Sequence, residues 1–263
     1  MGILNVTPDS FSDGGHFLDS RAAYLHAIHM IEQGVDIIDI GGESTKPGAE
    51  AISCAEELAR IIPVIERIRA VSDICISVDT SKAEVMQAAI AAGASFINDV
   101  AALSGDDSLA TAARLNVPVC LMHMQGVPKS MQDNPSYTDN VVDEINLFFQ
   151  QRIDACLKAG FCREQLILDP GFGFGKSVQH NLSIVKRFSE FQQHGLPLLL
   201  GVSRKSTIGA VLQKGVSERL TGSIATEIVA ALHGASIIRT HDVGETNQAL
   251  QMVDAIVGSM EQI

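Results

Sequence analysis

The sequence predicts an α/β fold: a single (β/α)8 TIM-barrel domain over residues 1–263, with its active site at the carboxyl ends of the strands. Three observations lead to this prediction. The length of 263 residues suits one closed barrel, which needs about 250. Short apolar runs rich in β-branched residues alternate with segments of helical period, eight times over, as in a barrel of parallel strands. No linker or low-complexity tract divides the chain.

The predicted strands lack an alternating polar face, which is typical of strands buried on both sides of a parallel sheet. They cover residues 2–6, 35–40, 75–78, 95–98, 118–122, 165–168, 196–202 and 236–239. The predicted helices cover residues 22–32, 55–71, 82–92, 108–115, 140–159, 178–193, 218–233 and 245–260.

An open, doubly wound sheet is the alternative architecture. It usually has a G-x-G-x-x-G turn after its first strand, and this sequence has none there. The glycines at 171, 173 and 175 have the wrong spacing. The sequence therefore favours the closed barrel.

Composition restricts the classes of partner. Hydrophobic residues make up 46% of the chain and charged residues 19%, with a formal net charge of −12, so the chain should fold around a large core. An acidic protein has no basic face with which to neutralise nucleic acid or an anionic membrane. We therefore expect small-molecule partners, no nucleic acid and no membrane.

Cysteine usage and the N-terminal sequence bear on location. The five cysteines form no C-x-x-C pair and are expected to be free thiols, as in a reducing compartment. No cationic segment precedes a long apolar run at the N-terminus, and no apolar stretch reaches the roughly 18 residues of a membrane span. The prediction is a cytoplasmic protein.

Polar residues or glycines follow almost every predicted strand. In a barrel these ends converge on one face, where active sites lie. The alternative for each residue is that it caps the next helix, and Asp79, followed by Thr80 and Ser81, best fits that role. The segments that follow the strands begin at Asn5, Asp39, Asp79, Asn98, His123, Asp169, Ser203 and Arg239.

The first loop, T-P-D-S-F-S-D-G-G at residues 7–15, places Phe11 after the first strand. A glycine-hinged loop with one aromatic residue could cover a polar site, exclude water and stack on a flat substrate. The alternative is that Phe11 fills the barrel rim.

Eight segments of the sequence, in order, resemble motifs of the dihydropteroate synthase family, pterin-binding barrel enzymes that are the target of sulfonamides. The match extends from residue 2 to about residue 244, and the first-loop and S-R-K-S segments are specific to this branch. The segments are GILNVTPDSFSDGG, DIIDIGGESTKPGA, ISVDTSK, FINDV, LMHMQG, DPGFGFGK, GVSRKS and IIRTHDV.

The resemblance implies a transferase of folate biosynthesis. The family condenses 6-hydroxymethyl-7,8-dihydropterin pyrophosphate with p-aminobenzoate to give 7,8-dihydropteroate and pyrophosphate. Pyrophosphate leaves first, in an SN1-like step, and the neutral arylamine then attacks without a strong general base. The resemblance also implies Mg²⁺ and a homodimer.

The resemblance further implies a pterin site with a carboxylate, Asp169, facing the N3–H and 2-amino edge of the ring. Arg239 would stack on the pterin and reach the anion. The implied pterin-binding residues are Asp79, Asn98, Met122, Asp169, Phe174, Gly201, Lys205 and Arg239. The implied catalytic residues are Lys205, Arg239, His241, Asp79 and Asp169.

The other implied sites serve p-aminobenzoate and pyrophosphate. A slot for p-aminobenzoate would consist of Phe11, Thr45, Pro47, Phe172 and Ser203. Pyrophosphate would contact Asn5, Arg239 and His241, and Mg²⁺ would bind Asn5 and Asp13. Lys46 stands where the family commonly has Arg, so its role as an anion contact stays open.

Two rival functions remain at this stage. A pterin-binding methyltransferase would share the Asp79, Asn98 and Asp169 edge but has no use for the S-R-K-S segment or for Phe11. A non-catalytic pterin-binding paralogue would not need Lys205 and the other charged residues at the strand ends. Formation of dihydropteroate discriminates among the three.

Overall fold

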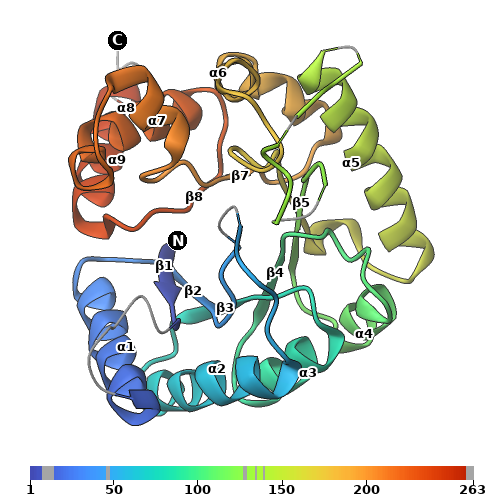
Figure 1. Ribbon diagram of the computed structural model, residues 1–263, viewed down its shortest axis with the longest axis vertical. Helices are drawn as coiled ribbons and strands as arrows, with labels where there is room; N and C mark the ends of the chain where they lie inside the picture. The colour runs from blue at the N-terminus through green and yellow to red at the C-terminus, as the bar shows by residue number, and fades with distance from the viewer. Residues whose placement is uncertain (8–14, 46–47, 127–128, 134, 139, 259–263) are drawn as a thin grey trace.

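The computed structural model describes residues 1–7, 15–45, 48–126, 129–133, 135–138 and 140–258. Among them, eight parallel strands surround the centre of the molecule (Figure 1), which confirms the predicted barrel. They are β1 Gly2–Asn5, β2 Ile37–Gly41, β3 Cys75–Asp79, β4 Phe96–Asp99, β5 Val119–Met122, β6 Leu166–Asp169, β7 Leu199–Leu200 and β8 Ile237–Ile238. The last two are shorter than the sequence predicts.

Backbone hydrogen bonds close the strands into a ring. Strands β1 to β6 pair in sequence order, and β7 pairs with β8. Leu168 forms a bridge to Leu198, which joins β6 to the segment before β7, and Gly2 forms a bridge to Thr240 after β8. The amide of Ile3 donates to the Thr240 carbonyl at 2.9 Å. The carboxyl ends of all strands therefore meet at one mouth.

Helices surround the strands as an outer layer (Figure 1). Capping residues place several of them: the Ser53 hydroxyl accepts from the Glu56 amide at the start of α2, and Asn140 caps α5 in the same way. The helices in the described ranges are α1 Gly15–Glu32, α2 Cys54–Arg69, α3 Ala83–Ala91, α4 Ser108–Leu115, α5 Val141–Lys158, α6 Val178–Lys186, α7 Ser206–Leu212, α8 Leu220–Leu232 and α9 Val243–Gly258.

Three helical segments differ from the prediction. Helix α1 begins at Gly15, seven residues before the predicted start at residue 22. The seven-residue α7 is not among the helices predicted from period, because two turns show too little period to be read from sequence. The predicted helix over 178–193 stops at Lys186 and continues as 3-10 turns over Phe188–His194.

The core has two parts, because side chains alternate along each strand. Residues such as Ile38 and Ile40 belong to the large cluster between strands and helices. Side chains on the other face point into the barrel. At its amino-terminal end they form a small apolar cluster, here called the basal layer: Met1, Phe96, Cys120, Ile167 and Leu199.

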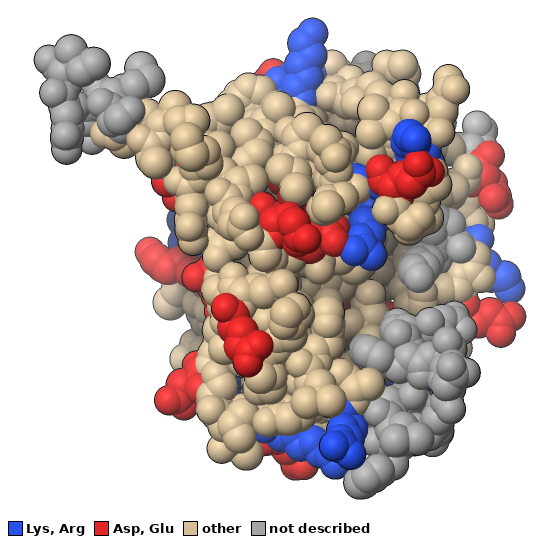
Figure 2. Space-filling view, turned by 90° about the vertical axis from the view of Figure 1, so that its left-hand side faces the viewer, with Lys and Arg blue, Asp and Glu red and all other residues tan. Residues whose placement is uncertain are grey.

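The surface carries scattered charges. On the face shown in Figure 2, acidic and basic side chains lie in small scattered groups, some of them side by side, with no continuous basic patch among the residues that are drawn in colour. In the described part of the chain, no helix has the length and apolar character that crossing a bilayer requires.

Candidate active site

The inward faces of the strands change from apolar to polar toward the mouth. Two residues beyond the basal layer, β4 presents Asn98 and β6 presents Asp169. The strand register pairs Asp79 with Asn98 and Met122 with Asp169. We call the polar set Asp39, Asp79, Asn98, Asp169 and Arg239 the polar layer.

Arg239 connects strands that are distant in sequence. Its Nε lies 2.6 Å from Asp39 Oδ2, and one terminal nitrogen lies 2.9 Å from Asp79 Oδ2. Asn98 Nδ2 donates to the same Asp39 oxygen at 3.0 Å. Gly201, at the end of the neighbouring strand, lies close to Arg239, since a Cβ added at Gly201 would lie 3.5 Å from Arg239 Cβ. The end of β8 is thereby fixed to β2, β3 and β4.

Asp169 lies on the other side of the polar layer, and Lys205 lies beside it. The Gly171 amide donates to Asp169 Oδ1 at 2.7 Å. Lys205 Nζ donates to the Phe172 carbonyl and lies 4.5 Å from the centroid of the Phe174 ring. Burial lowers the pKa of Lys205 to about 8, although Asp169 opposes this shift.

Burial also acts on the carboxylates of the polar layer. It raises the pKa of Asp169. Burial, and then the nearby Asp39, raise the pKa of Asp79 to about 7. Carboxylates with raised pKa values, held beside cations in a barrel mouth, are typical of a functional site.

The glycine-rich loop after β6 is held tightly. A Cβ on Gly171, whose φ is +67°, would lie 1.8 Å from the His123 carbonyl oxygen, so only glycine fits. Lys176, which is buried, donates from Nζ to the carbonyls of His123 and Phe174 at 3.2 and 3.0 Å. The loop therefore presents Phe174 in a fixed place.

A cavity of about 410 Å³ opens at the mouth above the polar layer. It gathers nine of the residues that the sequence predicted for the site: Asn5, Thr45, Asp79, Phe174, Gly201, Ser203, Lys205, Arg239 and His241. Met131, Ser206, Arg204 and Ser44 also line it and had no predicted role.

Four further predicted residues are buried nearby. Asn98, Met122 and Asp169 are between 4 and 6% exposed. Phe172 is 1% exposed and is not among the described residues that line the cavity, where the sequence placed it beside p-aminobenzoate. Its carbonyl instead accepts from Lys205. Phe11, Asp13, Lys46 and Pro47 lie outside the described residues.

His241 and Ser203 contact each other at the cavity wall. The His241 amide donates to Ser203 Oγ at 3.1 Å, and the ring Nδ1 lies 3.0 Å from the same oxygen. Burial, followed by the charges of Arg239 and Arg204, lowers the pKa of His241 to about 4. The imidazole is therefore neutral near pH 7, and its other nitrogen is available as a donor or acceptor.

Two interpretations from sequence need correction. Asp79 does not cap α3: the N-cap is Lys82, without a side-chain capping bond among the described residues, and Asp79 binds Arg239 instead. Ser203 does not cap α7 either, since the N-cap there is Lys205.

Asp39 was missed as a site residue. Its carboxylate is 0% exposed. The sequence did contain a signal for this residue, because a lone Asp within an apolar strand needs a buried partner. Met131 gave no signal, since it comes from the irregular segment between β5 and α5.

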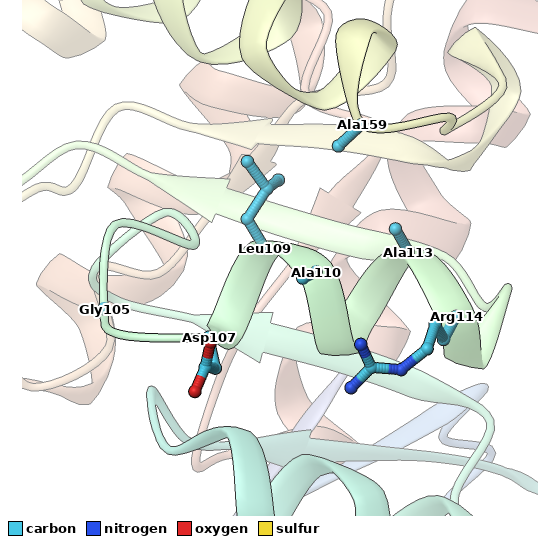
Figure 3. Close-up of a pocket in the computed structure, with 7 residues that line it drawn as sticks. All are labelled: Gly105, Asp107, Leu109, Ala110, Ala113, Arg114 and Ala159. Atoms are coloured by element: carbon cyan, nitrogen blue, oxygen red, sulfur yellow. The ribbon is translucent and has the colours of Figure 1, made fainter.

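A second hollow, of about 610 Å³, lies on the outer side along α4. Figure 3 shows Asp107 and Arg114 at opposite ends of this helix, with Leu109, Ala110 and Ala113 between them. Arg114 donates to Thr111 at 2.9 Å. No described strand end contributes to this hollow, so it gathers fewer polar and charged side chains than the barrel mouth.

Comparisons with known proteins agree with this geometry. The family described as "Pterin binding enzyme" matches residues 1–241. The chain is 53% identical over 261 residues to the dihydropteroate synthase of Escherichia coli strain K12, covering 99% of this chain and 92% of that protein.

Solved structures are also similar to this chain. The Yersinia pestis dihydropteroate synthase in a sulfonamide drug complex superposes with a TM-score of 0.93 at 49% identity, covering 98% of this chain and 94% of that one. The Xanthomonas albilineans dihydropteroate synthase with 4-aminobenzoic acid gives a TM-score of 0.92 at 46% identity, with 97% and 92% covered.

Proposed function

The chain belongs to the dihydropteroate synthase branch of the pterin-binding enzyme family, and from this premise we propose how its residues divide the reaction. It is a transferase that condenses 6-hydroxymethyl-7,8-dihydropterin pyrophosphate with p-aminobenzoate in folate biosynthesis. We propose that residues 1–263 act as one pterin-binding domain. The observation that carries the proposal is Arg239 bridging Asp39 and Asp79, because it assembles charges from three strands at one mouth.

The pterin ring binds in the polar layer. Asp169 accepts hydrogen bonds from ring N3 and the 2-amino group, while Asp79 and Asn98 serve the other ring nitrogens. All three side chains are at least nine-tenths buried, so ligand N–H groups that satisfy them gain much more than they would in water.

Lys205 and Arg239 bind the same ring from other directions. Lys205 donates to the O4 and N5 side, and its Nζ already faces the Phe174 ring. Arg239 stacks its guanidinium plane on the pterin, for which Arg is better suited than Lys. Met122, Phe174 and Gly201 form the walls.

The departing pyrophosphate meets donors on the cavity wall. Arg239 supplies a fixed positive charge, and neutral His241 supplies a donor from the nitrogen that Ser203 does not contact. Asn5 lines the same side of the cavity. Groups held in place before charge develops lower the barrier most effectively.

Mg²⁺ fits this donor set. Within the described residues, no group of three or more His, Cys, Asp or Glu could hold a metal ion. Mg²⁺ at a phosphate site takes one or two protein oxygens, substrate oxygens and water, and Asn5 at the cavity offers one. Asn5 would hold the ion together with Asp13. When bound, Mg²⁺ would neutralise charge on the pyrophosphate.

The p-aminobenzoate slot lies at the outer part of the cavity. Thr45 and Ser203 line the cavity, and we assign Phe11 and Pro47 to the same slot. Phe172 contributes indirectly, because its carbonyl accepts a hydrogen bond from Lys205 Nζ.

The bond changes follow from this placement. The carbon–oxygen bond of the pterin methylene breaks first, and its electron pair leaves with pyrophosphate. Asp79 and Asp169 stabilise the pterin cation. The neutral arylamine nitrogen then forms the new carbon–nitrogen bond and releases a proton, so the chain needs positioning more than a strong base.

The deciding assay measures dihydropteroate from pterin pyrophosphate and labelled p-aminobenzoate. We expect product with Mg²⁺, loss of product with EDTA, and recovery when Mg²⁺ is restored. Absence of product with Mg²⁺ would contradict the synthase activity. Full activity in EDTA would contradict only the proposed role of Mg²⁺.

We also propose a homodimer that meets on the outer face of α8 and α9. Large apolar side chains are exposed there, and such patches mark protein interfaces. They are Val229, Leu232, Met252, Ile256 and Val257. Sedimentation velocity should give a dimer for the wild type and a monomer for Leu232→Asp; a wild-type monomer would contradict the proposal.

A cytoplasmic location completes the proposal. It is supported by the five cysteines, all of which are free thiols, as expected in a reducing compartment. Fractionation of cells that produce the protein tests it.

A further inference from the structure

The segment between β2 and α2 carries part of the cavity wall. We call residues 42–45 and 48–53 the second loop. Ser44 and Thr45 line the cavity. Neither β2 nor α2 includes them, so contacts outside the cavity must determine where Thr45 stands.

Glu43 closes the second loop upon itself. Its Oε1 accepts from the Ile52 amide at 3.1 Å, which joins the two ends of the loop. Its Oε2 lies 2.5 Å from Lys82 Nζ. Nearby, Arg60 donates to the Gly42 carbonyl at 2.7 Å. One carboxylate thus spans the base of the loop and links it to a neighbouring element.

Lys82 also forms an ion pair with a second carboxylate, that of Glu57 in α2. Its Nζ lies 2.5 Å from Glu57 Oε2, and the Glu57 side chain is 0% exposed. Gly42 packs directly on Glu57, since a Cβ at Gly42 would lie 3.0 Å from Glu57 Cγ. The ammonium group therefore fastens the loop to the first turn of α2.

Lys82 also links the loop to the polar layer. It follows Asp79 by three residues, and its amide donates to Thr80 Oγ1 at 3.3 Å. Burial lowers the pKa of Lys82, but the hydrogen bonds that its ammonium donates to the Glu43 and Glu57 carboxylates outweigh this effect and raise the pKa, so the ammonium stays charged. Neither Lys82 nor Glu43 is among the described residues that line the cavity.

We propose that Glu43 and Lys82 are positioning residues for p-aminobenzoate: their ion pair holds the second loop so that Thr45 faces the second substrate. This inference rests on the proposed contact between Thr45 and p-aminobenzoate. None of the proposed pterin contacts belongs to the second loop, so loss of the ion pair should weaken binding of p-aminobenzoate and leave binding of the pterin unchanged.

The first test is Glu43→Gln, which keeps an acceptor for the Ile52 amide and removes the ion pair. We expect KM for p-aminobenzoate to rise about tenfold, as for loss of positioning alone. We expect kcat to change less than about twofold and KM for pterin pyrophosphate to stay unchanged. Lys82→Arg should keep most of the wild-type affinity, because it retains the charge.

A matched control removes an ion pair elsewhere. Glu190→Gln breaks the pair with Arg187 near the end of α6 and should leave both KM values unchanged. An equal rise of both KM values in Glu43→Gln, or no rise for p-aminobenzoate, would overturn the proposal.

A double-variant cycle separates positioning from a general structural effect. If Glu43 acts through Thr45, then Glu43→Gln combined with Thr45→Ala should bind p-aminobenzoate no more weakly than Thr45→Ala alone. Additive losses would overturn the proposal. If Thr45→Ala has no effect by itself, the proposed role of Thr45 fails. If the wild type forms no product, the proposed function fails instead.

Discussion

The basal layer and the polar layer of the barrel occupy the same strands, yet they have opposite chemistry. Phe96 and Asn98 share one face of β4, and Ile167 and Asp169 share one face of β6. Within each pair the side chains are similarly buried, at 3 and 5% exposure for the first and 7 and 6% for the second. A displacement of two residues along a strand therefore changes the role of an inner side chain, while its burial stays the same.

The comparison shows how the barrel separates stability from function. Burial stabilises the apolar basal layer. In the polar layer it disfavours charge, which is why the pKa of Asp169 is raised. We expect variants of the polar layer to lose function and variants of the basal layer to lose stability.

The largest effect is expected for Asp169→Asn. An amide presents a donor where the pterin edge needs an acceptor, so affinity for pterin pyrophosphate should fall about 1000-fold or more. Stability should not fall, because a buried carboxylate is removed. Isothermal titration and thermal unfolding measure the two quantities, and retained affinity would mean that the ring lies elsewhere.

The pH dependence of His241 comes next. Its folded pKa of about 4 lies below the unfolded value, so its full contribution to stability is present above about pH 6.5. As the pH falls toward 4, the His241 imidazole of the unfolded chain binds a proton, whereas the imidazole of the folded chain stays neutral. Relative to His241→Gln, the free energy of unfolding of the wild type should fall by about 3 kcal/mol over this window. Urea unfolding at several pH values measures it; a constant difference would show that the pKa is not lowered.

Arg239→Lys should lower kcat about 100-fold, as for loss of a preorganised group at a developing anion. Lysine keeps the charge but cannot bind Asp39 and Asp79 from two sides. Single-turnover kinetics would isolate the chemical step. A loss confined to KM would assign Arg239 to substrate binding alone.

The smallest effect is expected in the basal layer. Ile167→Val removes one methylene and should lower the free energy of unfolding by about 1 kcal/mol, with kcat unchanged. Chemical denaturation and steady-state assays of the folded protein measure both, and a large fall in kcat would remove the distinction between the layers.

Much of the fold could be predicted from sequence because its signals are local. Apolar runs and helical periods identify the strands and most helices, and the order of the chain then forces their polar ends to one mouth. Helix α7 was absent from the helices predicted from period, because seven residues carry little period.

The site was harder to predict where it depends on long-range pairing. Asp39 and Arg239 are 200 residues apart in sequence, so no local pattern reveals their contact. For the same reason Asp79 resembled a helix cap. Phe172 was assigned to a slot from its motif, whereas packing turns its ring into the core and leaves its carbonyl for Lys205.

A crystal structure of the protein with dihydropterin pyrophosphate tests the central claim most directly. The account predicts the pterin ring inside the barrel mouth, with Asp169, Asn98 and Asp79 on its nitrogens and Arg239 across its face. A ring bound outside the polar layer, for example in the hollow along α4, would contradict it.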